Sequence, residues 1–163
     1  MDSAHNRASA SLLRAALGSY FPGRPLVLVF GASDDKDVAG MLQVLTPGAA
    51  LVVATQSRHP RAADAALVAQ AARQCGVPAS QVMVASPVAE ALALALQQAG
   101  QDAVICVAGS LFAAAEAREA WLALHPASLP AEDWARQAEP AEPGWHVTGA
   151  SAPSPLHAPV AAP

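Results

Sequence analysis

Short, uninterrupted apolar runs constrain the fold of this chain more than any other feature. The clearest run is Leu26-Val27-Leu28-Val29-Phe30, which lies between a Pro/Gly-containing turn and Gly31. A strand that exposes one face alternates apolar and polar residues, whereas a strand buried on both faces is apolar throughout. The sequence therefore predicts buried strands at residues 26–30, 51–54, 82–84 and 103–107.

Amphipathic segments lie between these runs. Val38, Met41, Leu42 and Leu45 recur at the spacing of one helix face, and Asp37 stands where a helix cap is expected. The same reasoning predicts helices near residues 12–20, 37–45, 63–75, 88–96 and 110–124. Strands that alternate with helices form βαβ units and a parallel sheet. We therefore expect an α/β fold, a Rossmann-like three-layer sandwich with a mostly parallel sheet flanked by helices.

The composition changes near residue 124. All the predicted strands and helices lie within residues 1–124, whereas eight of the fourteen prolines lie within residues 126–163, among alanine, serine and glutamate. A segment of this kind buries too little apolar surface to offset the entropy cost of ordering it. We expect one folded domain at 1–124 and a disordered Pro/Ala-rich tail at 125–163, with at most a brief helical or docking turn around Trp134.

The charge balance and the two cysteines argue against several classes of function. Nine basic and thirteen acidic residues provide no broad basic surface for nucleic acid or a membrane. The uncharged stretch 38–57 is split by Pro47-Gly48, so we expect no membrane span. Cys75 and Cys106 lack the spacing of a metal site, which predicts two reduced core thiols. No apolar signal segment opens the chain, which favours a cytoplasmic protein.

The loops after the predicted strands form the expected functional edge, because open parallel sheets bind ligands outside the carboxyl ends of their strands. The loop at 31–37 includes Ser33 and Lys36 but has neither G-x-G-x-x-G nor G-x-x-x-x-G-K-[ST]. Its three aspartates would also repel phosphate at a helix start, so an independent ATP or dinucleotide site is not expected there. Alternatively, these aspartates cap the following helix while Lys36 balances their charge.

Three other places add polar groups to the predicted edge or beside it. His59 and Arg61 follow the second strand, and an arginine fork suits a carboxylate, although a solvated basic loop is an equal alternative. Ser110 stands at a helix start that can bind a small anion, although capping alone also explains it. Asp2 and His5 precede the first helix, where solvent exposure in a frayed terminus is the simpler explanation. The residues alone indicate a domain that binds a small anion or carboxylate.

Four motifs, in this order, resemble those of the folylpolyglutamate synthase / dihydrofolate synthase branch of the Mur ligase superfamily. The segment 2–7 (DSAHNR) is similar to the family's D-G-A-H-N-P, and 31–37 (GASDDKD) to its G-x-x-x-D-K-D. The segment 57–62 (SRHPRA) is similar to an H-P-R-A or N-P-R-A loop, and 109–112 (GSLF) to G-S-L-[YF]. The resemblance covers about residues 1–122 and implies the fold of a Mur ligase C-terminal domain.

The resemblance implies ATP-dependent amide formation, in which L-glutamate is added to folate or dihydropteroate. It implies that Asp2 and His5 contact ATP, that Ser110 and Phe112 bind glutamate, and that the loops with Ser33, Lys36, His59 and Arg61 face the same cleft. The P-loop and Mg²⁺ sites of such enzymes belong to amino-terminal and central domains, so ATP and Mg²⁺ would be held mainly by those partner domains, in cis or in trans.

The sequence departs from the family pattern in a few places. Ser3 replaces the usual glycine, Arg7 the usual proline and Phe112 the common tyrosine. Met1 directly precedes Asp2, where the family has a strand, and we expect the chain not to turn over substrate without the P-loop domains. Two alternatives remain: a non-catalytic Rossmann-like module that binds small anions or partners, and a truncated gene product.

Overall fold

Strands and helices alternate along the domain, as the sequence predicts. The computed structural model describes residues 1–2 and 4–126, all of which fall in the compact unit Met1–Ser128. The helices are α1 (Arg7–Tyr20), α2 (Val38–Leu45), α3 (Ala65–Gln74), α4 (Val88–Gln98) and α5 (Leu111–Leu124), with a short 3-10 turn η1 (Ala79–Gln81). The strands are β1 (Leu26–Phe30), β2 (Ala49–Ala54), β3 (Val82–Val84) and β4 (Val104–Ala108).

The four strands form one parallel sheet in the order β3-β2-β1-β4. At its centre, Leu28 of β1 pairs with Val52 of β2 on one side and with Cys106 of β4 on the other. Every residue of β1 is buried, because strands on both sides and helices above and below exclude water from it. This arrangement confirms the predicted α/β fold with a parallel sheet flanked by helices.

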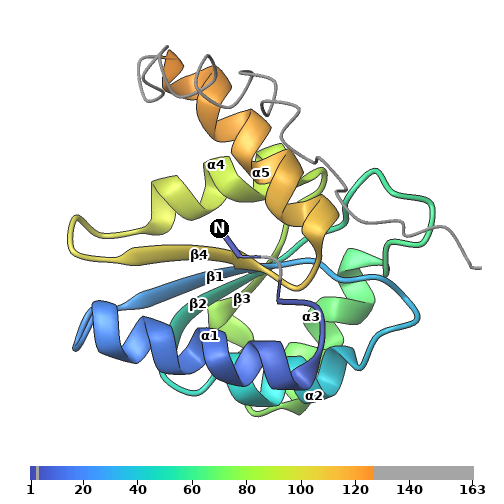
Figure 1. Cartoon of the computed structure of the whole chain (residues 1–163), viewed down its shortest axis with the longest axis horizontal. Coiled ribbons are helices and arrows are strands. Elements are labelled where there is room, and N and C mark those ends of the chain that lie inside the picture. The colour runs from blue at the N-terminus through green and yellow to red at the C-terminus, as the bar shows by residue number, and fades with distance from the viewer. Residues whose placement is uncertain (3, 127–163) are drawn as a thin grey trace, which may run out of the picture. The chain divides into compact units, whose positions relative to one another are not determined.

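Helices cover both faces of the sheet (Figure 1). Leu28 and Phe30 of β1 point into a core shared with α1, α2 and α3, whereas Val27 and Val29 point into a second core shared with α4 and α5. Successive side chains of a strand alternate between the faces of the sheet, so one apolar run supplies both cores. The continuous hydrophobicity of residues 26–30 is thereby explained.

The first helix begins at Arg7 rather than near residue 12, because the Asn6 capping box starts it earlier, and the other observed bounds differ from the predicted ones by one or two residues. β2 begins at Ala49 rather than residue 51, and β4 is shifted by one residue. α3 begins at Ala65 because the Asp64 carboxylate accepts hydrogen bonds from the N–H groups of Ala66 and Leu67. The domain boundary at 124 stays a prediction, and the tail, including Trp134, lies outside the described residues.

The two cysteines do not lie in equivalent places. Both are free thiols, but only Cys106, on β4, is buried, whereas Cys75 is half-buried at the carboxyl end of α3. The prediction of two core thiols is confirmed for Cys106, whereas Cys75, the C-cap residue of α3, packs against the core without being fully buried. Across residues 1–2 and 4–126, no helix is long and apolar enough to cross a membrane.

Burial of Cys106 makes the domain less stable at alkaline pH. Burial raises the pKa of this thiol from 9.0 to about 11, because a thiolate is poorly solvated in the core. The unfolded chain therefore releases this proton at lower pH than the folded chain. The contribution is fully present below pH 9 and is lost as the pH rises towards 11, amounting to about 2–3 kcal/mol.

We expect urea denaturation between pH 7 and 11 to show this loss in the wild-type chain. The matched variant Cys106→Ala lacks the thiol, so its free energy of unfolding should fall less steeply over the same range. Parallel curves for the two proteins would contradict the assignment.

Candidate functional site

The order of strands reverses between β1 and β4. From β1 the chain proceeds to β2 and β3 on one side of the sheet, and only then returns to add β4 on the other side. The loops after β1 and β4 therefore leave in different directions and open a crevice between them, which is where open α/β sheets bind ligands. The carboxyl ends of both strands meet at this crevice, because Phe30 pairs with Ala108.

A hollow of about 300 Å³ occupies this crevice. Its lining comes from the amino-terminal segment, the loops after β1 and β2, and the start of α5. The lining residues are His5, Ser33, Asp35, Lys36, Arg61, Gly109, Ser110, Leu111 and Phe112. Six of the eight residues singled out from the sequence are among them. The exceptions are His59, which stacks on Phe112 at the rim, and Asp2.

The amino-terminal segment is held beside β4. The Asp2 N–H donates to the Val107 carbonyl at 2.9 Å, and the Gly109 N–H donates to the Ala4 carbonyl at 3.0 Å. One Asp2 carboxylate oxygen, Oδ1, accepts the Ala4 N–H at 2.7 Å. These bonds hold the segment in place, so it is not frayed, although Asp2 and His5 are exposed as that alternative expects. His5 lies at the hollow.

The entry to α1 is an ordinary capping box in spite of the departures from the family pattern. The Asn6 side chain accepts the Ser9 N–H at 2.8 Å, and the Ser9 hydroxyl oxygen accepts the Asn6 N–H at 3.2 Å. Arg7, where the family has proline, is the first residue of the helix. Ser3 lies outside the described residues.

Gly109 forms the tight floor between the two strand ends. Its φ is +104°, and a Cβ built there would lie 2.7 Å from the Gly31 carbonyl oxygen and 2.8 Å from the Phe30 ring. Glycine is required both by this left-handed backbone and by the close approach of the neighbouring chain. The β4–α5 turn can pack against β1 only because no side chain stands between them.

Ser110 begins α5 inside the hollow. Its hydroxyl oxygen accepts the Phe112 N–H at 3.1 Å, and the residue is only 5% exposed. The capping role considered from the sequence is thus confirmed. Capping uses the hydroxyl as an acceptor and leaves its O–H free to donate to a ligand. The amino end of a 14-residue helix also carries partial positive charge, which favours an anion in this position.

The three aspartates after β1 have different roles. Asp37 caps α2, with its carboxylate accepting the Gly40 N–H at 2.8 Å. Asp35 pairs with the Lys36 ammonium at 2.9 Å, and this hydrogen bond is the main reason that the pKa of Asp35 is lowered. Asp34 donates its N–H to the Arg61 carbonyl. The suggestion that all three cap the helix is therefore right for Asp37 only.

The loop after β2 is fastened to α5 by side chains. The His59 ring stacks on the Phe112 ring, with centroids 3.9 Å apart and an interplanar angle of 18°. Arg58 pairs with Glu119 at 2.9 Å and with Glu116 at 3.5 Å. Sequence reasoning missed both glutamates. The available signal was the spacing of Phe112, Glu116 and Glu119 by four and three residues, which places them on one side of a helix.

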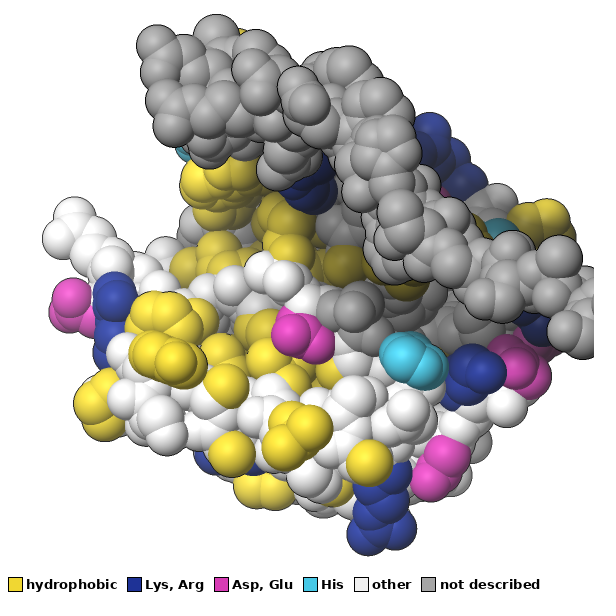
Figure 2. Space-filling view, in the orientation of Figure 1, with side chains coloured by type: hydrophobic (Ala, Val, Ile, Leu, Met, Phe, Trp, Pro, Cys, Tyr) yellow, Lys and Arg dark blue, Asp and Glu magenta, His cyan; other side chains and the backbone are white. Residues whose placement is uncertain are grey.

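The charged side chains that line the hollow, Lys36, Arg61 and Asp35, give it a net positive charge. Lys36 is neutralised by Asp35, whereas the Arg61 guanidinium forms no ion pair within the part of the chain that the structure describes. On the face shown in Figure 2, histidine, basic and acidic side chains gather at the right, the side to which the carboxyl ends of the strands point. No group of three His, Cys, Asp or Glu side chains among residues 1–2 and 4–126 could hold a metal ion. The arrangement suits a carboxylate or another small anion.

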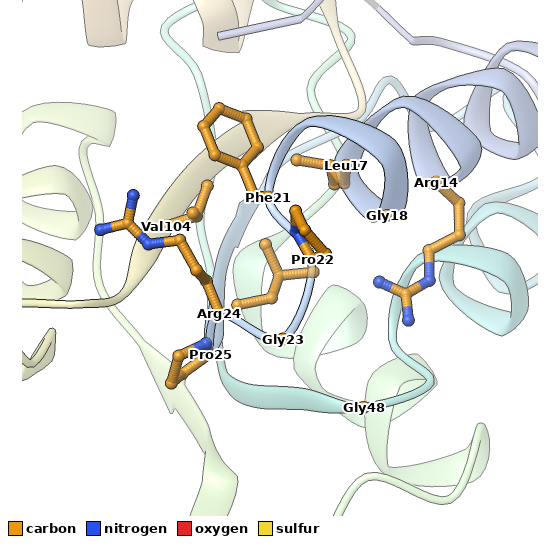
Figure 3. A pocket seen from close by; sticks show the side chains of 11 residues that line it. Arg14, Leu17, Gly18, Phe21, Pro22, Gly23, Arg24, Pro25, Gly48 and Val104 are labelled. Carbon is orange, nitrogen blue, oxygen red and sulfur yellow. The ribbon is translucent and has the colours of Figure 1, made fainter.

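A second hollow, of about 500 Å³, lies at the opposite edge of the sheet (Figure 3). Arg14 and Arg24 flank it, with Phe21 and Pro22 between them. Arg14 donates to the Pro47 carbonyl and Arg24 to the Asp102 carbonyl, each at 2.7 Å. Both arginines thus bind carbonyl groups in the loops that precede β2 and β4. None of the eight residues singled out from the sequence lines this hollow.

Comparison with known proteins identifies the family. Residues 1–111 match the family model described as "Mur ligase, glutamate ligase domain". The chain belongs to this family. It is 37% identical over 121 residues to a probable bifunctional folylpolyglutamate synthase/dihydropteroate synthase of Halobacterium salinarum, covering 74% of this chain and 14% of that one. It is 44% identical over 72 residues to a dihydrofolate synthase/folylpolyglutamate synthase of Mycobacterium tuberculosis, covering 44% of this chain and 15% of that one.

Solved structures agree with this membership. Folylpolyglutamate synthase of Mycobacterium tuberculosis complexed with ADP superposes with a TM-score of 0.67 and 33% identity, over 73% of this chain and 28% of that one. A Yersinia pestis folylpolyglutamate synthase/dihydrofolate synthase complexed with AMPPNP and a Mn ion superposes with a TM-score of 0.63 and 27% identity. The match covers 74% of this chain and 28% of that one. The chain thus spans about a seventh of these curated relatives and about a quarter of the solved chains.

The close packing at Gly109 of this ligase domain predicts a specific cost. Gly76→Ala meets the same type of backbone strain, with φ +92°, but nothing lies within 4 Å of its Cβ, so it should cost about 1–2 kcal/mol. Gly109→Ala should cost about 1–3 kcal/mol more, because its Cβ is also forced against Gly31 and Phe30. Urea denaturation of the two variants measures the difference, and equal losses would show that the contact at the hollow is not tight.

Proposed function

We propose that this domain binds L-glutamate in the hollow at the carboxyl ends of β1 and β4, which we call the carboxyl-edge hollow. The domain would act as part of an ATP-dependent ligase that adds glutamate to folate or dihydropteroate. One observation carries the proposal: residues from four separate motifs, resembling those of folylpolyglutamate synthases, line or border a single cationic hollow at the switch point of the sheet. The names of the relatives support the same class of reaction.

Within this proposal the start of α5 binds glutamate. Ser110 donates its hydroxyl proton to a glutamate carboxylate, and the first turn of the helix adds N–H groups that lack helical partners. Phe112 lies beside Ser110 and packs against the methylene groups of the amino acid. Arg61, with no ion pair of its own within residues 1–2 and 4–126, supplies a fork of donors for a carboxylate.

The residues near the amino terminus suit a nucleotide. Asp2 is exposed, and its Oδ1 accepts the Ala4 N–H, which leaves Oδ2 to accept a ribose hydroxyl. His5 lies at the hollow and would contact the same nucleotide. The sequence has no phosphate loop, so the phosphates of ATP and the Mg²⁺ ion would be held mainly by P-loop and central domains.

In the proposed reaction ATP supplies the phosphoryl group that activates the carboxylate of the folate or dihydropteroate. The residues of this domain hold glutamate so that its amine can displace phosphate and form the amide. Positioning of this kind accelerates a reaction because it removes the entropy cost of bringing two substrates together. We expect the 163-residue chain to catalyse no turnover by itself.

Reconstitution tests this function. The chain, mixed with or fused to the P-loop part of a folylpolyglutamate synthase, should restore ATP-dependent incorporation of labelled glutamate. Ser110→Gly removes the hydroxyl but keeps most of the capping energy, so it should raise the KM for glutamate about tenfold or more with a small change in kcat.

Asp64→Gly serves as the matched control, since it removes the cap of α3 outside the hollow and should leave this KM unchanged. A folded mixture without activity would contradict the ligase proposal. Calorimetric binding of an unrelated anion, with no response to glutamate, folate or ATP, would support a binding module instead.

A further inference from the structure

The loop that carries Arg61 is held by a set of contacts on one side of α5. Phe112, Glu116 and Glu119 follow one another at intervals of four and three residues, so they project from the same side of the helix. His59 stacks on the first of these residues, and Arg58 pairs with the other two. Two neighbouring loop residues therefore contact the first three turns of the helix that begins at Ser110.

Glu116 is the best-anchored member of this set. One of its carboxylate oxygens accepts the Arg58 N–H at 2.8 Å, and the other lies 3.5 Å from Nε of the Arg58 side chain. Its side chain is 13% exposed, whereas those of Arg58 and Glu119 are about 70% exposed. A shielded carboxylate that also accepts a main-chain N–H constrains geometry more than a pair of exposed side chains does. The Arg58–Glu119 pair is the weaker contact.

These contacts reach the hollow through His59. The Nδ1 atom of His59 accepts the Arg61 N–H at 3.2 Å, and the Arg61 carbonyl accepts the Asp34 N–H at 2.9 Å. Both main-chain groups of Arg61 are thus fixed, one by the loop and one by the segment after β1. The Arg61 side chain then lines the hollow together with Ser110 and Phe112.

We infer that Arg58 is a positioning residue, which acts through Glu116 and the His59–Phe112 stack to hold Arg61 over the ligand-binding hollow. Arg58 itself does not line the hollow. This inference deepens the proposed function and rests on it, because the ligand that the loop would serve is the glutamate of that proposal. It assigns Glu116 of α5 the role of anchoring the loop that carries Arg61.

The test combines a structural and a functional measurement on the 163-residue chain. Stacking shifts the NMR signals of the His59 ring protons upfield, which reports the loop position without any ligand. Calorimetry with L-glutamate as the probe measures the affinity of the hollow for this ligand. Five variants separate the contacts: Glu116→Ala, Glu116→Gln, Glu119→Gln, Arg58→Met and Arg58→Lys. Arg73→Met, on the exposed surface of α3, is the control with the same loss of charge.

Glu116→Ala loses both contacts with Arg58, so it should abolish the upfield shift and weaken glutamate binding about tenfold. Glu116→Gln keeps the acceptor for the main chain, and Arg58→Met keeps the main-chain donor, so each should weaken binding by about three- to fivefold. Arg58→Lys should recover part of that loss because it restores the charge without the fork. Glu119→Gln and Arg73→Met should stay within about twofold of the wild type.

Two results would overturn the inference. One is a His59 shift that persists in Glu116→Ala, which would show that the loop does not depend on this anchor. The other is a lost shift with unchanged affinity for glutamate, which would show that the loop does not serve the hollow. A wild-type chain that shows the His59 shift but binds no glutamate would count against the proposed function instead, so the two failures are distinguishable.

Discussion

The parallel pairing of β1 with β4 is the interaction on which the candidate site depends. It sets Phe30 opposite Ala108, and it continues beyond the strands through the hydrogen bond from the Gly31 N–H to the Ala108 carbonyl. Because the order of strands reverses here, the two loops diverge and leave room for a ligand. Gly109 completes the arrangement, since any side chain at this position would collide with the end of β1.

A single helix then organises the chemistry of the hollow. α5 places Ser110 and the N–H groups of its first turn at the hollow, while the outer side of its first three turns fastens the loop from β2. Contacts between segments distant in sequence fix the main chain of Arg61 before a ligand arrives. Preorganised groups bind more tightly because less conformational entropy is lost on binding. In the proposed function the same helix both binds the ligand and positions Arg61, which would explain how a sparsely charged domain recognises a small anion.

The sequence predicts those features that depend on local physics. The apolar run at 26–30, the Asp37 cap and the Ser110 cap follow from patterns within a few residues, and the structure confirms them. The Arg58–Glu116 contact joins residues 58 positions apart, and the bonds that hold Asp2 beside β4 involve main-chain groups that every residue carries. The spacing along α5 indicates the side of the helix on which Glu116 lies but not its partner, and the main-chain bonds leave no local signal. Six of the eight residues that the motifs single out line the hollow, but only the fold shows how they are held together.

A titration of the isotope-labelled chain with L-glutamate, followed by amide NMR shifts, tests the central claim most directly. Binding in the carboxyl-edge hollow should move the signals of Gly109, Ser110, Phe112 and Arg61 in a saturable way, because these amides line the hollow or lie in its loops. The signal of Gly48, at the opposite edge of the sheet, should stay in place. Shifts confined to the amino edge, or none at saturating glutamate, would contradict this account.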